Sequence, residues 1–257
     1  MHDTAGMLAQ PDHAGHQPGK SGRVVPDQLD QLRGGVHPSS MAAIFFKPRR
    51  PTGGEDRHRE ENTTMATLIA IEFVSVDGVM QGLGSPDEDR AGGFELGGWG
   101  ARYAPGIADI GGRGAVETAA YLFGRRTYEK MADFWPTQPD SNPIAASLNT
   151  RPKYVASRTL HDPDWTGTTV LDGELGSAIT RLKGDVDGRI AVLGSGLLVH
   201  ELLRLEFIDE LHLFIHPLLL GTGKRLLRDL PRPRELELAD VQTTALGSVA
   251  LRYLLRH

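Results

Sequence analysis

The sequence contains no cysteine among its 257 residues, which excludes disulfide bonds, thiolate metal sites and a cysteine nucleophile. Long hydrophobic runs are also missing, since none reaches the roughly 18–20 residues that cross a bilayer. The longest apolar run near the N-terminus, Met41–Phe46, is shorter than the roughly 7–15 residues of a signal-peptide core. The formal net charge is −5 and no basic stripe is present, so no nucleic-acid surface is indicated. These absences predict a soluble, cytoplasmic protein with neither a membrane nor a nucleic-acid partner.

Residues 1–64 also lack a sustained hydrophobic period of two or 3.6 residues. This segment is rich in His, Pro, Gly, Asp and Arg, which predicts a disordered extension before a single domain at 65–257. Its histidines are scattered without carboxylate or cysteine neighbours, and His212 and His216 are equally isolated, so no metal site is predicted. The character of the chain changes abruptly at Met65, which is a candidate for its biological start.

From Met65 onward, short apolar runs alternate with segments that have the period of a helix, which is typical of an α/β sheet that is parallel in its middle. Two final strands predict a C-terminal antiparallel hairpin. Strands are expected at Thr67–Val76, Tyr121–Phe123, Lys153–Ser157, Thr168–Leu171, Ile190–Leu193, Glu210–Leu220 (broken by Pro217), Glu235–Thr243 and Ser248–Arg256. Helices are expected at Ala115–Ala120, Gly124–Asp133, Leu175–Lys183 and Leu197–Leu205, with a loop at Trp135–Asn142.

Three of the expected strands end in residues suited to phosphate. The ends are Gly124-Arg125-Arg126-Thr127, Ser157-Arg158 and Gly194-Ser195-Gly196, the last followed by Leu197 and Leu198 at a helix start. Parallel strands bring their carboxyl ends to one edge, where ligands bind in open α/β sheets. A glycine turn at a helix N-terminus can hold a pyrophosphate, and arginines form forked hydrogen bonds to an extra phosphate, which favours NADPH over NADH. The alternatives are a tight turn without a ligand and arginines that are solvated surface charges.

Further candidates lie in loops. Asp77 ends the first strand, where it could orient substrate or relay a proton, or could cap its own turn. Asp87 lies in the glycine-rich, acidic segment Gly82–Gly114, and an irregular segment of this length is more often functional than not. Asp87 could bind amino groups of a heterocycle or be a solvated charge. Trp99 and Trp135 could stack on a flat ring or pack over the core.

Four segments resemble the dihydrofolate reductase fold in their order and spacing. They are Leu68–Val79, Tyr121–Thr127, Tyr154–Arg158 and Ile190–Leu198. The chain from about Met65 to Arg256 is most similar to the reductase domain of riboflavin biosynthesis and its stand-alone relatives. Further support comes from the segments Ser75–Gly78, Asn149–Ser157 and His216–Leu227.

The resemblance implies a mixed, mostly parallel central sheet with flanking helices. It also implies a homodimer and NADPH-dependent hydride transfer to a pteridine-like or aminopyrimidine substrate of the riboflavin pathway. By position, Gly124–Thr127 and Ser157-Arg158 would hold the adenosine-side phosphates, and Gly194–Leu198 the pyrophosphate.

The chain also departs from these relatives, because it has no Cys/His zinc deaminase domain upstream. The Gly82–Gly114 segment replaces a simple helix that carries a substrate-binding carboxylate in true dihydrofolate reductases. A non-catalytic dinucleotide or small-ligand binding protein on the same fold is the alternative function, and an interaction protein that keeps only the scaffold is a third.

Overall fold

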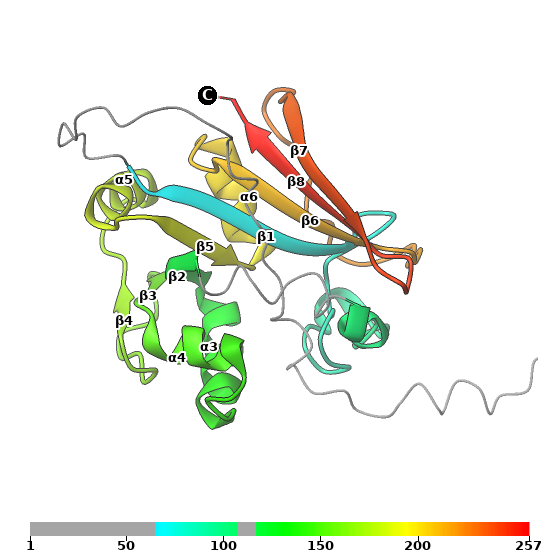
Figure 1. Cartoon of the computed structure of the whole chain (residues 1–257), viewed down its shortest axis with the longest axis horizontal. Helices are drawn as coiled ribbons and strands as arrows, with labels where there is room; N and C mark the ends of the chain where they lie inside the picture. The colour runs from blue at the N-terminus through cyan, green and yellow to red at the C-terminus, as the bar shows by residue number, and fades with distance from the viewer. Residues whose placement is uncertain (1–64, 107–116, 257) are drawn as a thin grey trace, which may run out of the picture. The chain divides into compact units, whose positions relative to one another are not determined.

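The computed structural model describes residues 65–106 and 117–256. In this part of the chain eight strands form one sheet in the order β4-β3-β2-β5-β1-β6-β8-β7 (Figure 1). The strands from β4 to β6 are parallel, whereas β8 runs antiparallel to both β6 and β7. This architecture confirms the predicted dihydrofolate reductase-like fold with its C-terminal hairpin. The strands are β1 (Thr67–Ser75), β2 (Thr118–Gly124), β3 (Lys153–Ala156), β4 (Thr168–Val170), β5 (Arg189–Leu193), β6 (Glu210–His216), β7 (Leu236–Thr243) and β8 (Val249–Leu255).

Helices cover both faces of the sheet. Successive side chains of a strand point to opposite faces, so the continuous apolar strands present apolar side chains on both. Ile69 and Phe73 of β1 belong to a hydrophobic cluster that includes α3 and α4, while Leu68 and Ala70 pack in a second cluster with α5 and α6. The helices are α3 (Arg125–Phe134), α4 (Pro143–Thr150), α5 (Leu175–Asp185) and α6 (Gly196–Arg204), with short 3-10 helices η3 (Ala91–Gly93), η4 (Ala101–Tyr103) and η6 (Trp135–Thr137).

The central strand β1 extends beyond its neighbour β5. Ile71 is the last β1 residue that pairs with β5, opposite Leu193, whereas pairing with β6 continues to Ser75 opposite His216. From Glu72 onward, one edge of β1 therefore has no strand beside it among the described residues.

Two expectations need correction. Thr118–Ala120 belong to β2 and not to a helix, and Ala115 and Val116 lie outside the described residues. Alanine favours helices by intrinsic propensity, but Ala120 is fully buried in a parallel strand, where continuous apolar runs are typical. The strand expected over 210–220 ends at His216, since Pro217 has no N–H to donate to a sheet.

Helix α4 has no counterpart among the predicted elements. The Asn142 side chain caps it by accepting from the N–H groups of Ile144 and Ala145 at 3.0 and 3.5 Å, and Pro143 occupies its first position. Asparagine and proline are equally common in loops, so these two residues did not distinguish a helix start from a turn.

Candidate functional site

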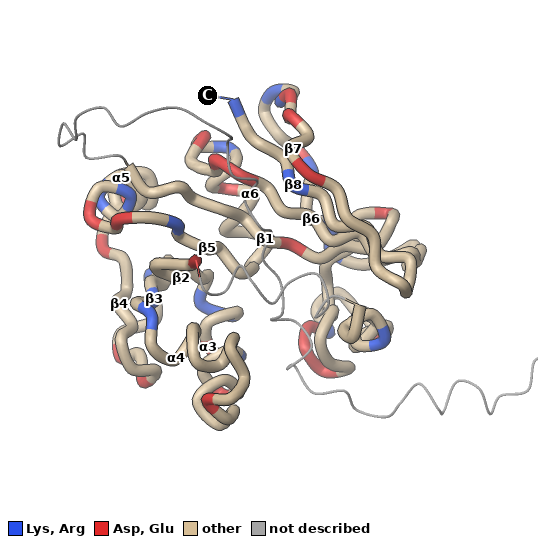
Figure 2. Tube along the Cα trace, viewed as in Figure 1, with Lys and Arg blue, Asp and Glu red and all other residues tan. Residues whose placement is uncertain are grey.

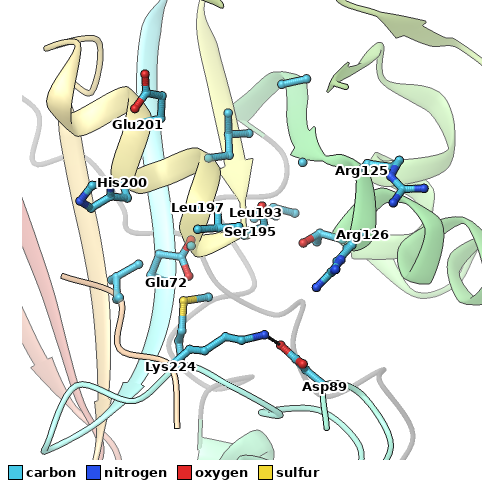
Figure 3. Close-up of a pocket in the computed structure, with 18 of the residues that line it drawn as sticks. Glu72, Asp89, Arg125, Arg126, Leu193, Ser195, Leu197, His200, Glu201 and Lys224 are labelled. Carbon is cyan, nitrogen blue, oxygen red and sulfur yellow. Dashed lines mark hydrogen bonds and ion pairs between the residues drawn. The ribbon is translucent and has the colours of Figure 1, made fainter. Parts of the chain in front are cut away.

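A cavity of about 1270 Å³ opens at the carboxyl ends of β2, β3 and β5, beside the second half of β1 (Figure 3). Pockets for ordinary small molecules hold roughly 300–1000 Å³. The cavity therefore has room for a ligand of dinucleotide size. Its place beyond the carboxyl ends of parallel strands is where open α/β sheets bind ligands.

The cavity forms because the neighbouring strands β2 and β5 send their helices to opposite faces of the sheet. Side chains of α3 pack in one hydrophobic cluster and those of α6 in the other. The two turns meet closely, since a Cβ atom on Gly124 would lie 2.3 Å from Ser195 Oγ. Glycine at position 124 therefore allows both turns to line the same crevice.

All eleven residues predicted to bind the cofactor line this one cavity. Their side chains and backbones come from three strand ends that are neighbours in the sheet. Their binding of a dinucleotide stays a prediction. The eleven are Gly124, Arg125, Arg126, Thr127, Ser157, Arg158, Gly194, Ser195, Gly196, Leu197 and Leu198.

The N-termini of α3 and α6 at this cavity have no side-chain cap. Gly124 and Ser195 occupy their N-cap positions, and neither makes a capping hydrogen bond through a side chain. In contrast, Asn142 caps α4 and Glu174 caps α5. The first N–H groups of a helix need an acceptor and carry a positive partial charge. Two helix ends at the cavity are thus available to an anionic ligand.

Two of the three arginines add positive charge that no carboxylate of the described residues neutralises. Arg126 and Arg158 are exposed and form no ion pair within 65–106 and 117–256, while Arg125 contacts Glu129 at 3.2 Å. Ser157 Oγ accepts from the N–H groups of Thr159 and Leu160, which leaves its own proton to donate. Guanidinium, hydroxyl and helix N–H donors together suit the phosphates of a dinucleotide. Elsewhere acidic and basic residues are interspersed (Figure 2).

Glu72 of β1 also lines the cavity, although no motif marks it. It is 3% exposed, and burial raises the pKa of Glu72 from the usual 4.5 to about 8, a rise that a hydrogen bond from the Gly194 backbone moderates. Its Oε1 atom is buried and has no hydrogen-bond partner in the described part of the chain. Glu72 is therefore a neutral acid at neutral pH. The sequence signal is a lone charge inside the apolar run Leu68–Val74.

The wall opposite the strand ends comes from two loop segments, 80–90 and 224–229. Lys224 joins them, since its backbone N–H donates to Gln81 Oε1 at 2.9 Å and its ammonium group to Asp89 Oδ2 at 2.6 Å (Figure 3). Part of the predicted functional segment 82–114 thus lies at the cavity, and 107–116 lie outside the described residues.

Asp77 does not line the cavity. Its carboxylate accepts from the Ser75 hydroxyl at 2.6 Å and from the N–H groups of Leu220 and Gly221 at 3.1 and 2.9 Å. These hydrogen bonds, above all the one from Ser75, lower the pKa of Asp77 to about 2. The carboxylate fastens the turn after β1 to the segment after β6, which is the structural alternative to a catalytic role.

The three residues expected to touch substrate do not line the cavity either. Asp87 is exposed and pairs with Arg90 at 2.5 Å. Trp99 and Trp135 are buried in the core, at 9% and 0% exposure, and Trp99 Nε1 donates to the Gln81 carbonyl at 2.7 Å. Both indole rings pack on protein and offer little surface for stacking on a ligand.

The two histidines of β6 have protein partners. His212 Nε2 lies 2.8 Å from the Glu210 carboxylate, and His216 Nδ1 lies 2.8 Å from the Ser248 hydroxyl. Burial lowers the pKa of His216 to about 4, and its ring stacks on Tyr103 at 4.7 Å. Over the described ranges, no three acidic or histidine side chains are grouped to hold a metal ion, and no helix is long and apolar enough to span a bilayer.

Comparisons with known proteins identify a relative in sequence and several solved structures that are similar to this chain. The protein YyaP of Bacillus subtilis (strain 168), itself uncharacterized, is 27% identical over 135 residues, which are 51% of this chain and 71% of YyaP. A putative riboflavin biosynthesis protein from Shewanella sp. PV-4 superposes with a TM-score of 0.54 at 17% identity, over 75% of this chain and 100% of the other. Dihydrofolate reductase from Enterococcus faecalis, solved with NADP(H), gives a TM-score of 0.43 at 14% identity, over 74% and 97%.

The strongest assignment comes from residues 66–251, which match the RibD C-terminal domain. The match spans most of the chain and all of the strands that form the cavity. The fold shared with the Shewanella protein agrees with it. This chain therefore belongs to the RibD C-terminal domain family.

Proposed function

We propose that this protein is an NADPH-dependent reductase that transfers a hydride to a pteridine-like or aminopyrimidine substrate, of the 5-amino-6-(5-phosphoribosylamino)uracil type in the riboflavin pathway. The observation that carries the proposal is the convergence of three strand ends, with their arginines, hydroxyls and uncapped helix N-termini, on one cavity. Membership of a reductase-type family supports the same class of reaction.

The residues divide into two groups by the phosphates they would hold. Arg125, Arg126 and Arg158 would bind the phosphates on the adenosine side, including the extra phosphate that distinguishes NADPH from NADH. The turn Gly194–Gly196 and the start of α6 would bind the pyrophosphate. NADPH supplies a hydride when bound, and the protein's task is to hold it against substrate and to manage a proton.

Calorimetric titration of the purified protein with NADPH and with NADH tests the proposal. We expect Arg126→Ala and Arg158→Ala each to weaken NADPH about tenfold, the equivalent of about 1.4 kcal/mol for a lost charge-assisted contact, and to leave NADH nearly unchanged. Arg125→Ala should have a smaller effect, because Glu129 already engages this side chain. Arg151→Ala is the matched control, since Arg151 is exposed and lies at the opposite end of β3, outside the cavity.

Failure of wild-type protein to bind NADPH would overturn the proposal. Equal losses for NADPH and NADH would show that these arginines do not read the extra phosphate. If NADPH binds but neither dihydrofolate nor the riboflavin-pathway pyrimidine is reduced, neither compound is a substrate. That result would favour the alternative, a non-catalytic binding protein.

We also infer a homodimer, which the resemblance to the riboflavin reductase domain implies. Strand β6 cannot pair with a second copy of the chain, because it is an internal strand between β1 and β8. The edge strand β7 instead exposes Leu236, Leu238 and Val241 on one face, beside half-buried Tyr253 of β8. A second copy of the chain would bury these apolar side chains.

A further inference from the structure

We propose that Glu72 is the acid that gives a proton to the substrate during hydride transfer, an inference that rests on the proposed reductase function. No predicted residue fills this role, because Asp77 is held by its own turn outside the cavity.

The order of strands places Glu72 at the far end of the ligand. Arg158 follows β3, Arg126 follows β2, Gly194–Gly196 follow β5, and Glu72 lies in β1, so the four sites succeed one another across the sheet. Neighbouring strands are about 4.8 Å apart, which separates β3 from β1 by about 14 Å. A dinucleotide with its outer phosphate at β2 and β3 and its pyrophosphate at β5 directs its nicotinamide toward β1. Figure 3 shows Arg126 and Glu72 on opposite sides of Ser195.

The local geometry leaves Glu72 ready to interact with a ligand. It is the first β1 residue beyond the end of β5, next to the turn whose Gly194 N–H donates to its carboxyl group. The other carboxyl oxygen, Oε1, is buried and has no protein partner in the described chain. A buried polar atom that is left unpaired destabilises the structure, so a ligand group that hydrogen-bonds to it is bound more tightly.

Charged neighbours do not hold Glu72 in its ionised form. β6 presents the apolar Leu213 beside it, and β5 ends in Leu193. The charged groups that α6 and the segment 224–229 bring to the cavity are His200, Glu201, Lys224, Arg225, Arg228 and Asp229. Of the cations among them, Lys224 is bonded to Asp89 and Arg225 to the Asp77 carbonyl and carboxylate. Burial is the largest influence on the pKa of Glu72, which it raises to about 8.

The chemical step then balances without another protein group. NADPH bound at the strand ends would supply a hydride to the carbon of a C=N bond of the substrate and would leave oxidised. The π electrons of that bond would form a new N–H bond with the proton of Glu72. Glu72 would then be a carboxylate, which solvent would reprotonate through the cavity. A positioned general acid with a pKa near the working pH contributes roughly 10²–10⁴-fold in rate.

Proton release on binding of oxidised and reduced cofactor tests this role without a known substrate. NADP⁺ and NADPH carry the same phosphates and differ in the positive charge of the nicotinamide ring. If that ring lies beside Glu72, only NADP⁺ lowers the pKa of its carboxyl group. At pH 8, a fall of one unit from about 8 releases about 0.4 proton per site. Calorimetry in two buffers with different ionisation enthalpies measures this release.

We expect the wild-type protein to release about 0.4 proton more with NADP⁺ than with NADPH, and Glu72→Gln to abolish the difference. Glu201→Gln, which removes another carboxylate at the cavity, should keep it, because a hydrogen bond from Arg204 lowers the pKa of Glu201 and leaves no proton to release. Equal proton release for the two cofactors by wild-type protein overturns the role of Glu72. If neither cofactor binds, the proposed function itself has failed. The wild-type comparison stands even if Glu72→Gln does not fold.

Discussion

The carboxyl group of Glu72 is buried among apolar side chains. Its effect on the free energy of unfolding therefore depends on pH. Burial raises the pKa of Glu72 from 4.5 to about 8, so between these values the unfolded chain loses a proton that the folded chain retains. The free energy of unfolding therefore falls as pH rises through this window, by 1.36 kcal/mol per unit.

Glu72→Gln removes this dependence, because an amide does not titrate. Relative to the variant, we expect the wild-type protein to lose about 3 kcal/mol of unfolding free energy between pH 5 and pH 8. Urea denaturation of both proteins at each pH measures the difference. Other titrating groups, such as His216, act on both proteins alike and cancel. A difference that stays constant with pH would mean that Glu72 is ionised in the folded protein.

Residue identity alone could not decide which of the two acids, Asp77 or Glu72, is the proposed proton donor. An aspartate followed by glycine at a strand end is compatible with a turn and with a catalytic group, and only the contacts with Leu220 and Gly221 decide between them. Those partners lie more than 140 residues away in the chain. Glu72 was hidden because a single charge in an apolar strand carries no spacing that marks a site.

At the scale of elements, the crevice depends on how closely the turns after β2 and β5 approach. Gly124→Ala would bring a methyl group within 2.3 Å of Ser195 Oγ, although the backbone at Gly124, with φ of −79°, accepts alanine without strain. Overpacking of this kind costs about 1–3 kcal/mol. We expect the turn to move back and NADPH to bind roughly 5–150-fold more weakly.

Binding of NADPH to three variants checks this expectation. Adding Ser195→Gly to Gly124→Ala removes the clash and should restore most of the affinity. Gly184→Ala is the control for glycine replacement as such, since nothing lies within 4 Å of a Cβ atom there and the residue does not line the cavity. Unchanged affinity in Gly124→Ala would show that the two turns need not touch.

The helices α3, α5 and α6 were predicted from apolar side chains that recur with the period of a helix. The strands β3, β4 and β5 were predicted from short runs of apolar and β-branched residues. All six agree with the structure to within two residues. Helix α4 has only eight residues and a loop-like start, so its apolar period is too short to recognise. The N-terminal part of β2 resembles a helix in composition, and only its pairing with β5 fixes it as a strand.

For the whole molecule, the strand order could not be obtained from the sequence. β1 lies between β5 and β6, whose paired residues are more than 120 positions away in the chain, and nothing local specifies that pairing. The clustering of the strand ends could be predicted nevertheless, because any parallel arrangement brings carboxyl ends to one edge. The amino-acid sequence therefore indicated which residues form the proposed cofactor site. It did not indicate the order in which their strands lie across the sheet.

The proposed homodimer is a prediction at this scale. Leu238 is 53% exposed on the edge strand β7, and we expect Leu238→Lys to convert a dimer to a monomer in sedimentation velocity at micromolar concentration, because a charge would have to be buried in an apolar contact. Leu246→Lys, in the turn of the same hairpin and 43% exposed, should leave the dimer intact. A wild-type protein that sediments as a monomer would contradict the homodimer.

Lys224 and Asp77 join the loop after β1 to the loop after β6, which bears on how the substrate preference of the proposed reductase could be changed. Backbone hydrogen bonds from Met80 to Lys224 and from Leu226 to Gly78 extend this junction, so the loops after β1 and after β6 form one wall. Grafting one loop from a relative would leave half of these bonds without partners. New specificity should therefore be transferable only when both loops are exchanged together, while the strand ends across the crevice stay as they are.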